Sequence, residues 1–191
     1  MNPKLNRSEY KSTESYLFHL YNDLGCSDLK VACSFRKENG DTFWSKWLSF
    51  EELQHKDINE IVWKGYTRKR FLEIVSHRSV MDIEVMLDID EDPFGSKKKE
   101  DIEKYSQNLC RIMKKVGCSF EAYFSGSKSY HISILFPQFR SLKKFETEEI
   151  KKKILKRVCA DQAKFHVKSM IALEGVPHWK TGIIKQEVEY E

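Results

Sequence analysis

Two aspartates, Asp88 and Asp90, lie at the end of an apolar run in the stretch "VMLDIDEDPFGS". Burying carboxylates beside such residues is costly unless a cation or hydrogen-bond donors compensate. In a strand these two side chains point to the same face, with Cα atoms about 6–7 Å apart. Carboxylates at that spacing can reach one small cluster of Mg²⁺ ions, which prefer oxygen ligands. The pattern favours a divalent-metal site, although an acidic, solvated turn remains the alternative and is our interpretation of Glu91 and Asp92.

A second candidate site is the basic turn in "FSGSKSYHISI", where Gly126 allows close approach of the backbone to an anion. Lys128 adds a positive charge, and Ser129 and His131 point to one face of the following strand. Compact donors of this kind suit a triphosphate. An ordinary β-turn with an exposed lysine and a histidine at the core edge explains the turn equally well when it is considered alone.

The stretch "GVPHWKTG" near the C-terminus contains His178 and Lys180 beside glycine and proline residues. Alone, the stretch fits an ordinary polar loop between strands.

The elements that must position these residues follow from hydrophobic periodicity. Residues 80–90 predict a strand, and residues 120–136 predict two strands joined by the Ser-Gly-Ser-Lys turn. Between them, Ser96 is expected to cap a long helix that ends at Gly117. One apolar face of this helix comprises Ile102, Tyr105, Leu109, Ile112, Met113 and Val116. A charged helix is expected around residues 146–160.

The N-terminal part has its own signals. A helix over residues 12–24 begins near Ser12 and stops at Gly25, and a hairpin is centred on Asn39-Gly40. Ser49 and Glu52 form a predicted capping box for a short helix. Strands alternating with helices predict an α+β or α/β domain with mixed or antiparallel sheets flanked by helices.

Length and composition set further bounds. The 191 residues suit one domain, with 33 Lys and Arg against 29 Asp and Glu, so net charge alone does not indicate nucleic acid. Five cysteines without CxxC spacing indicate reduced thiols and no structural zinc. Because the chain shows no signal peptide and no apolar run long enough to span a membrane, we expect a cytoplasmic protein, nuclear if eukaryotic, with no membrane partner.

In this order, the three segments resemble the catalytic core of the archaeo-eukaryotic primase superfamily. The family includes the small catalytic subunit of DNA primase, primase-polymerases and the polymerase domains of bacterial end-joining ligases. Its first motif, a strand of the form hydrophobic-Asp-hydrophobic-Asp/Glu, matches Asp88 and Asp90. Its second, a Ser-x-His strand after an SG turn, matches Ser129 and His131, with Lys128 where the family often has a basic residue. The stretch "EGVPHWKTG" is similar to a Lys-Thr-Gly segment of primase small subunits.

The resemblance implies roles for these and other residues. His178 and Lys180 would contact the incoming nucleotide together with Lys128, Ser129 and His131. The third metal-binding acid is placed at Asp161, 17 residues before His178, with Glu174 as the fallback. The implied cofactor is a pair of Mg²⁺ or Mn²⁺ ions. The zinc stem of primase small subunits has no counterpart, because only 29 residues separate His131 from Asp161.

By this resemblance the chain is a template-directed nucleotidyltransferase, a DNA primase or primase-polymerase. It would form a single catalytic domain, with an N-terminal lobe over about residues 1–78 and a catalytic lobe over about 79–191. Its partners would be nucleoside triphosphates and a single-stranded DNA template with its primer. In a longer assembly, a helicase or a large primase subunit would be a further partner. Arg68, Lys69 and Arg70, between aromatic residues in "YTRKRF", are the candidate template contacts.

Three alternatives to a primase remain open from the sequence. One is a polymerase that extends chains without starting them, which uses the same metal site. Another is an inactive relative that binds nucleic acid in replication or defence. A third is a metal-dependent nuclease, which has less need of the triphosphate-binding residues 128–131.

Overall fold

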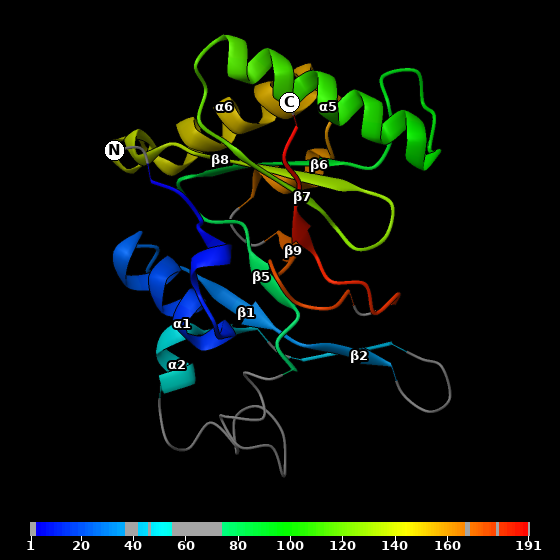
Figure 1. Ribbon diagram of the computed structural model, residues 1–191. Helices are drawn as coiled ribbons and strands as arrows, with labels where there is room; N and C mark the ends of the chain where they lie inside the picture. Colours follow the sequence, from blue (N-terminus) through cyan, green and yellow to red (C-terminus); the bar gives the residue numbers. More distant parts are fainter. Residues whose placement is uncertain are drawn as a thin grey trace.

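The computed structural model describes residues 3–36, 42–45, 47–54, 74–166, 169–178 and 180–190, and these form an α+β fold. Two four-stranded sheets, both antiparallel, have the strand orders β4-β1-β5-β9 and β10-β7-β8-β6, and β2 pairs with β3 in a separate hairpin. Figure 1 shows helices α5 and α6 beyond the second sheet, and α1 and α2 beside the first. The predicted fold class is confirmed.

The first sheet and its helices come mostly from the N-terminal part. Its strands are β1 Lys30–Ala32, β4 Leu48–Ser49, β5 His77–Ser79 and β9 Met170–Ala172. The hairpin consists of β2 Ser34–Arg36 and β3 Thr42–Trp44, and the helices are α1 Thr13–Phe18 and α2 Phe50–Gln54. β9 therefore brings a C-terminal segment into the sheet of the N-terminal lobe.

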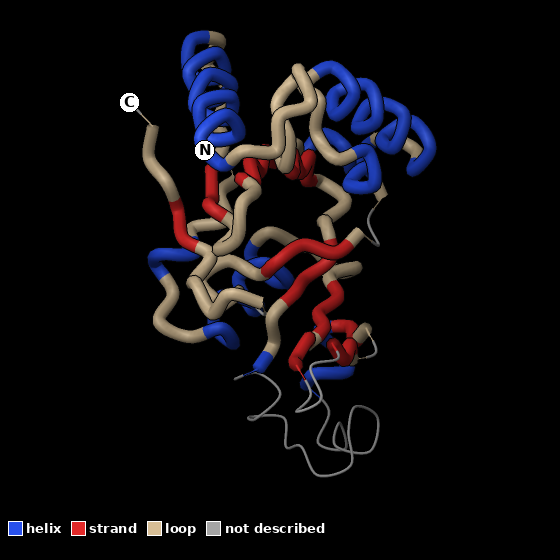
Figure 2. The backbone as a smooth tube through the Cα atoms, turned by 90° about the vertical axis from the view of Figure 1, so that its right-hand side faces the viewer, coloured by secondary structure: helices blue, strands red, loops and turns tan. Residues whose placement is uncertain are grey.

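The second sheet and the long helices form the other layer. The strands are β6 Glu84–Ile89, β7 Glu121–Phe124, β8 Tyr130–Leu135 and β10 Gln186–Glu187. The helices are α5 Lys99–Lys115 and α6 Lys144–Arg157, and the short 3₁₀ helix η4 Gln162–Phe165 follows α6. In the rotated view of Figure 2 the two long helices lie at the same end of the molecule, apart from one another.

Alternation along β6 separates core from site. Val85, Leu87 and Ile89 pack with residues of α5 and α6 in one apolar core. The intervening residues of the strand, which include Glu84 and Asp88, must therefore point to the opposite face, toward the first sheet. The predicted alternation of side chains between the two faces of the strand is therefore present, and the carboxylates lie on the face away from the helices.

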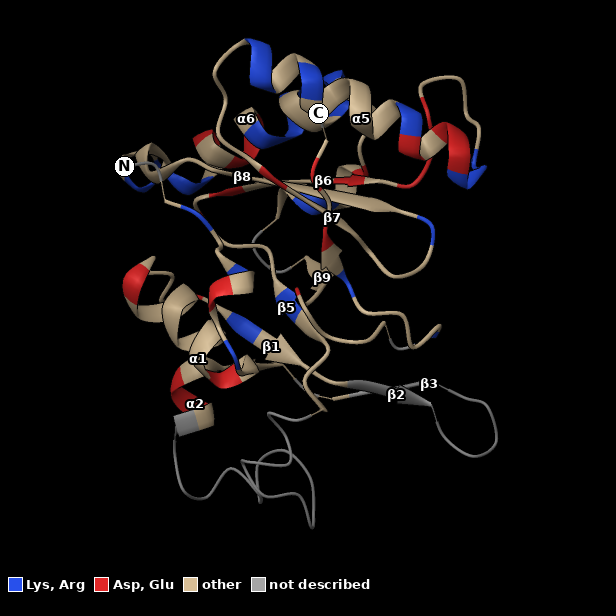
Figure 3. Ribbon diagram, in the orientation of Figure 1, with Lys and Arg blue, Asp and Glu red and all other residues tan. Residues whose placement is uncertain are grey.

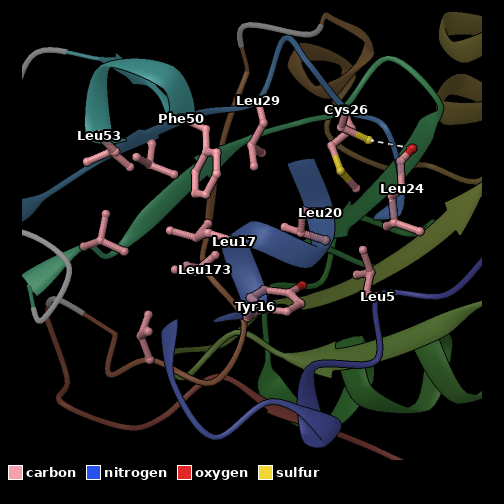
Figure 4. Packing of buried hydrophobic residues seen from close by; sticks show 14 of the residues in the cluster. Leu5, Tyr16, Leu17, Leu20, Leu24, Cys26, Leu29, Phe50, Leu53 and Leu173 are labelled. Carbon is pink, nitrogen blue, oxygen red and sulfur yellow. Dashed lines mark hydrogen bonds between the residues drawn. The ribbon is translucent and has the colours of Figure 1, made fainter. Parts of the chain in front are cut away.

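A second apolar core underlies the first sheet (Figure 4). Helix α1 begins where Ser12 Oγ accepts a hydrogen bond from the Ser15 N–H at 3.1 Å. At α2, Ser49 Oγ accepts from the Glu52 N–H at 3.1 Å, and Glu52 Oε2 accepts from the Ser49 N–H at 2.7 Å. The predicted capping box is therefore confirmed, and both helices hold their leucines in this core (Leu17 and Leu53).

A fully buried ion-pair network joins the two sheets. Arg78 of β5 donates to Glu84 Oε1 and Oε2 of β6 at 2.8 and 2.7 Å, and to Glu174 Oε2 after β9 at 2.9 Å. Lys185 Nζ donates to Glu174 Oε1 at 2.7 Å and to the Ala172 carbonyl at 2.8 Å. Each carboxylate thus faces a cation, which buried charges require. The network fixes the spacing of the sheets beside the candidate site.

Several local predictions are corrected. The strand of the first motif begins at Glu84 rather than at residue 80, because Val80 to Ile83 form a turn after β5. Helix α5 begins at Lys99, and Ser96 Oγ bonds the Asp101 side chain at 2.5 Å instead of capping the first turn. Ile112 and Val116 are 58% and 74% exposed, so they lie outside the buried face.

Two further expectations can be compared with the structure. All five cysteines are free, as predicted. Across the described ranges, no helix is both long enough and apolar enough to cross a lipid bilayer.

Candidate active site

The pairing of β6 with β8 places Asp88 directly opposite His131. His131 Nε2 lies 3.4 Å from Asp88 Oδ1, and the two side chains are only 5% and 16% exposed. Asp88 Oδ1 and His131 Nδ1 are buried and have no hydrogen-bond partner among the residues that the structure describes. Buried polar atoms nearly always have a hydrogen-bond partner, so these two atoms without one indicate a place for a ligand.

Asp161 lies beside Asp88, although the two are far apart in the sequence. The Asp161 N–H donates to the Asp88 carbonyl oxygen at 2.9 Å, and its Oδ1 accepts from the Ala163 N–H at the start of η4. Lys164 Nζ lies 3.4 Å from Asp88 Oδ2 and 3.5 Å from Asp161 Oδ2. One cation can therefore contact both carboxylates at once.

The protonation state of Asp88 follows from its neighbours. Burial by itself would raise the pKa of this carboxyl, but His131 and Lys164 outweigh burial and hold the pKa well below its usual range. Asp88 is therefore ionised at neutral pH. An ionised, buried carboxylate whose Oδ1 accepts no hydrogen bond from the described residues is suited to binding a cation.

The basic turn of residues 125–129 lies directly against the loop of residues 177–184. Gly126 adopts a φ of +88°, and a Cβ there would lie 2.8 Å from His178 Cβ and would overlap the Ile183 carbonyl oxygen. Thr181 Oγ1 donates to the Gly126 carbonyl, while the His178 N–H donates to the Ile183 carbonyl at 2.8 Å. The second and third segments of the predicted site thus form one joined structure.

Three histidines share positively charged surroundings at this junction. Burial, followed by His178 and Lys185, lowers the pKa of His77 to about 3. Burial and then Lys185 lower the pKa of His131, with Asp88 opposing them. Burial and then Lys180 lower the pKa of His178. At neutral pH the His77 and His178 rings are therefore uncharged, and a neutral imidazole has one N–H to donate.

His77 is a residue of these surroundings that sequence reasoning missed. It belongs to β5, whose pairing with β1 and β9 joins segments distant in the sequence. No local motif marks it. In the folded chain it lies within electrostatic range of His131 and His178.

The other predicted residues have mixed positions. Lys128 and Lys180 are exposed on the two joined loops, and Ser129 Oγ donates to Ser125 Oγ at 2.9 Å. Asp90 is half-buried just after the end of β6. Figure 3 shows lysines of the β7–β8 turn and of the start of α5 on the same side of the molecule.

The fallback acid is not part of this cluster. Glu174, the fallback acid, is fully buried and bonded to Arg78 and Lys185 in the network between the sheets. Arg68, Lys69 and Arg70 lie outside the described residues. Within the described ranges, no three His, Cys, Asp or Glu side chains are close enough together to hold a metal ion, so Asp88 and Asp161 approach one another without a third ligand.

Comparison with known proteins shows which solved structures have a similar fold. No protein-family model matches the sequence, and no curated protein matches it. The polymerase domain of Mycobacterium tuberculosis Ligase D, in complex with DNA, superposes with a TM-score of 0.55 at 12% identity, over 92% of this chain and 80% of that chain. The AEP domain of the cyanophage S-2L primase-polymerase gives a TM-score of 0.52 at 13% identity, over 92% and 88% of the two chains.

The chain has the fold of a primase-polymerase catalytic core. The resemblance that the three sequence segments suggested is confirmed at the level of the fold. At this low identity the likeness extends to the fold alone, and the roles of individual residues must be argued from this chain's own geometry.

Proposed function

We propose that this protein is a template-directed nucleotidyltransferase that adds nucleotides to a nucleic-acid strand, with single-stranded DNA as template. The observation that best supports the proposal is the ionised Asp88, held opposite His131 and beside Asp161. The joined loops of residues 125–129 and 177–184 add donors for a triphosphate. This set lies on a primase-polymerase fold.

The residues present fit a divalent cation. Asp88 Oδ1 is a buried acceptor without a hydrogen-bond partner in the described part of the chain, and the position of Lys164 shows that Asp88 and Asp161 can contact one cation. Carboxylate oxygens are the ligands that Mg²⁺ and Mn²⁺ prefer. Asp88 and Asp161 would hold such an ion, and Asp90 remains the further ligand predicted from the motif; a bound pair of ions would stabilise negative charge on the reacting phosphate.

The protein's own donors would bind and orient the triphosphate. His131 and His178 would donate N–H groups to its oxygens, and Ser129 would add a hydroxyl. Lys128 and Lys180, exposed at the rim, would provide positive charge without a fixed geometry. Donors held in advance where charge develops are the main source of rate enhancement in phosphoryl transfer.

The proposed reaction requires no nucleophile from the protein. The 3′-hydroxyl oxygen of the growing strand forms a bond to the α-phosphorus while the bond to pyrophosphate breaks. The hydroxyl proton passes to solvent water, and pyrophosphate leaves with the electrons of the broken P–O bond. Arg68, Lys69 and Arg70 remain the predicted contacts for the template, and a primase subunit or helicase remains a predicted partner.

The test is nucleotide incorporation on a single-stranded template, with and without primer, in Mg²⁺ or Mn²⁺. Asp88→Asn should lower incorporation at least about 100-fold, because it removes the negative charge that would hold the ion stabilising the transition state. Glu100→Gln is the matched control, because Glu100 is an exposed acid in the first turn of α5. It should retain wild-type rates.

Three results would separate the candidates. Pyrophosphate release with strand growth supports the transferase, and products without primer make it a primase. Shortened strands without pyrophosphate would instead identify a nuclease. Template binding without incorporation under any ion would identify a nucleic-acid-binding module and refute the proposal.

A further inference from the structure

Lys164 occupies an unusual place for a lysine. It belongs to η4, its side chain is only 15% exposed, and its Nζ donates to the Met170 carbonyl at 2.9 Å. The same Nζ lies 3.4 Å from Asp88 Oδ2 and 3.5 Å from Asp161 Oδ2. A single positive charge thus lies between two carboxylates that would bind a divalent ion.

An ammonium and a divalent ion cannot both use this position. Mg²⁺ binds carboxylate oxygens at about 2.0–2.1 Å, so an ion shared by Asp88 and Asp161 would lie within a few ångströms of Nζ. At about 5 Å, the repulsion between a divalent ion and an ammonium is equivalent to at least a tenfold change in affinity even in bulk water. In the partly buried site the effect is larger.

The rest of the site favours this competition. Asp161 is fixed on both sides, because its N–H donates to the Asp88 carbonyl and its Oδ1 caps η4. The carboxylates therefore cannot move apart easily to make room for a second cation. Lys164 is attached by a long, flexible side chain, so its ammonium is the part that can move.

We propose that Lys164 is a built-in counter-ion that competes with the divalent ion for Asp88 and Asp161. This inference rests on the proposed function of the same carboxylates. In the ion-free protein the ammonium neutralises them, and an ion must displace it from Asp88 in order to bind. The site then binds ions weakly until a triphosphate brings further oxygen ligands and negative charge, so that ion and nucleotide bind together.

The experiment measures Mn²⁺ binding to the full chain by titration calorimetry, in the absence of nucleotide. Lys164→Met keeps the length of the side chain and removes the charge, and should tighten Mn²⁺ binding about tenfold or more. Lys164→Arg keeps the charge and should stay within about threefold of the wild type. Lys156→Met, on the exposed last turn of α6, controls for the loss of one positive charge elsewhere and should leave the affinity unchanged.

Combining each variant with Asp88→Asn separates the two claims. If Asp88→Asn abolishes binding in the wild type but Lys164→Met leaves the affinity unchanged or weaker, the metal site stands and the role of Lys164 is refuted. If neither the wild type nor Lys164→Met binds Mn²⁺ at millimolar concentration, both this inference and the metal site fail. Circular dichroism of Lys164→Met checks that an affinity change is not caused by unfolding, and Lys164→Gln, which removes the charge but keeps a donor for Met170, should tighten Mn²⁺ binding in the same direction.

Discussion

The contact between the basic turn and the C-terminal loop can be tested at Gly126. This glycine is buried at the junction, and its φ of +88° lies in the left-handed region. A Cβ at Gly126 would lie 2.8 Å from His178 Cβ and would overlap the Ile183 carbonyl oxygen. Gly126→Ala must therefore move the loop that holds His178.

The structure also provides a control for backbone strain. Gly117 has a φ of +70° and Gly95 a φ of +82°, and a Cβ added at either glycine would meet nothing within 4 Å. Gly117→Ala and Gly95→Ala should cost only the left-handed strain, about 1–2 kcal/mol. Gly126→Ala should cost that amount plus about 1–3 kcal/mol for the overlap. For a chain of this size each kcal/mol lowers the melting temperature by about 2–4 °C.

Two measurements test the reasoning. Urea unfolding gives the stability difference between Gly126→Ala and Gly117→Ala, and primer extension below the melting temperature gives the functional difference. A displacement of His178 by about 1 Å should lower incorporation about 100-fold, whereas Gly117→Ala should retain the wild-type rate. If Gly126→Ala matched Gly117→Ala in both assays, the loops would not depend on this contact.

Three further predictions concern stability. Arg78→Met leaves Glu84 and Glu174 buried with fewer cations, and urea denaturation should show a loss of about 3–5 kcal/mol or failure to fold; a loss below about 1 kcal/mol would contradict the role of the network. The pKa of His77 is about 3 in the folded protein, below its ordinary value of 6.5, so between these values the unfolded chain binds a proton that the folded protein lacks. The free energy of unfolding should therefore fall as the pH falls from 6.5 toward 3, by up to about 1.4 kcal/mol per pH unit, and His77→Gln should flatten this dependence; an unchanged slope would show that His77 is not buried in its neutral form. Ser49→Ala removes the cap of α2 and should cost about 0.5–2 kcal/mol by thermal denaturation, with no effect expected on nucleotide incorporation.

Some local features were predictable because neighbouring residues decide them. The capping box of Ser49 and Glu52, the hairpin strands β2 and β3 and the alternation along β6 all depend on interactions within a few residues. The face of α5 was predicted less well. Its fully buried residues are Ile102, Ser106 and Cys110, and the predicted Tyr105, Leu109 and Met113 pack against the same core, while Ile112 lies to one side. Hydrophobicity alone could not show this, because the shape of the sheet below decides which positions are covered.

Short motifs were enough to identify the residues that could do chemistry at this site. Asp88, His131 and His178 could be found in this way, since residue type and the strand period are local properties. How these residues meet depends on the folded chain. The register of β6 with β8 sets Asp88 opposite His131, and the Asp161 N–H bonds the Asp88 carbonyl across more than seventy residues of sequence. Lys164 and His77 gained their positions in the same way, because contacts between distant segments depend on packing that no single stretch of sequence encodes.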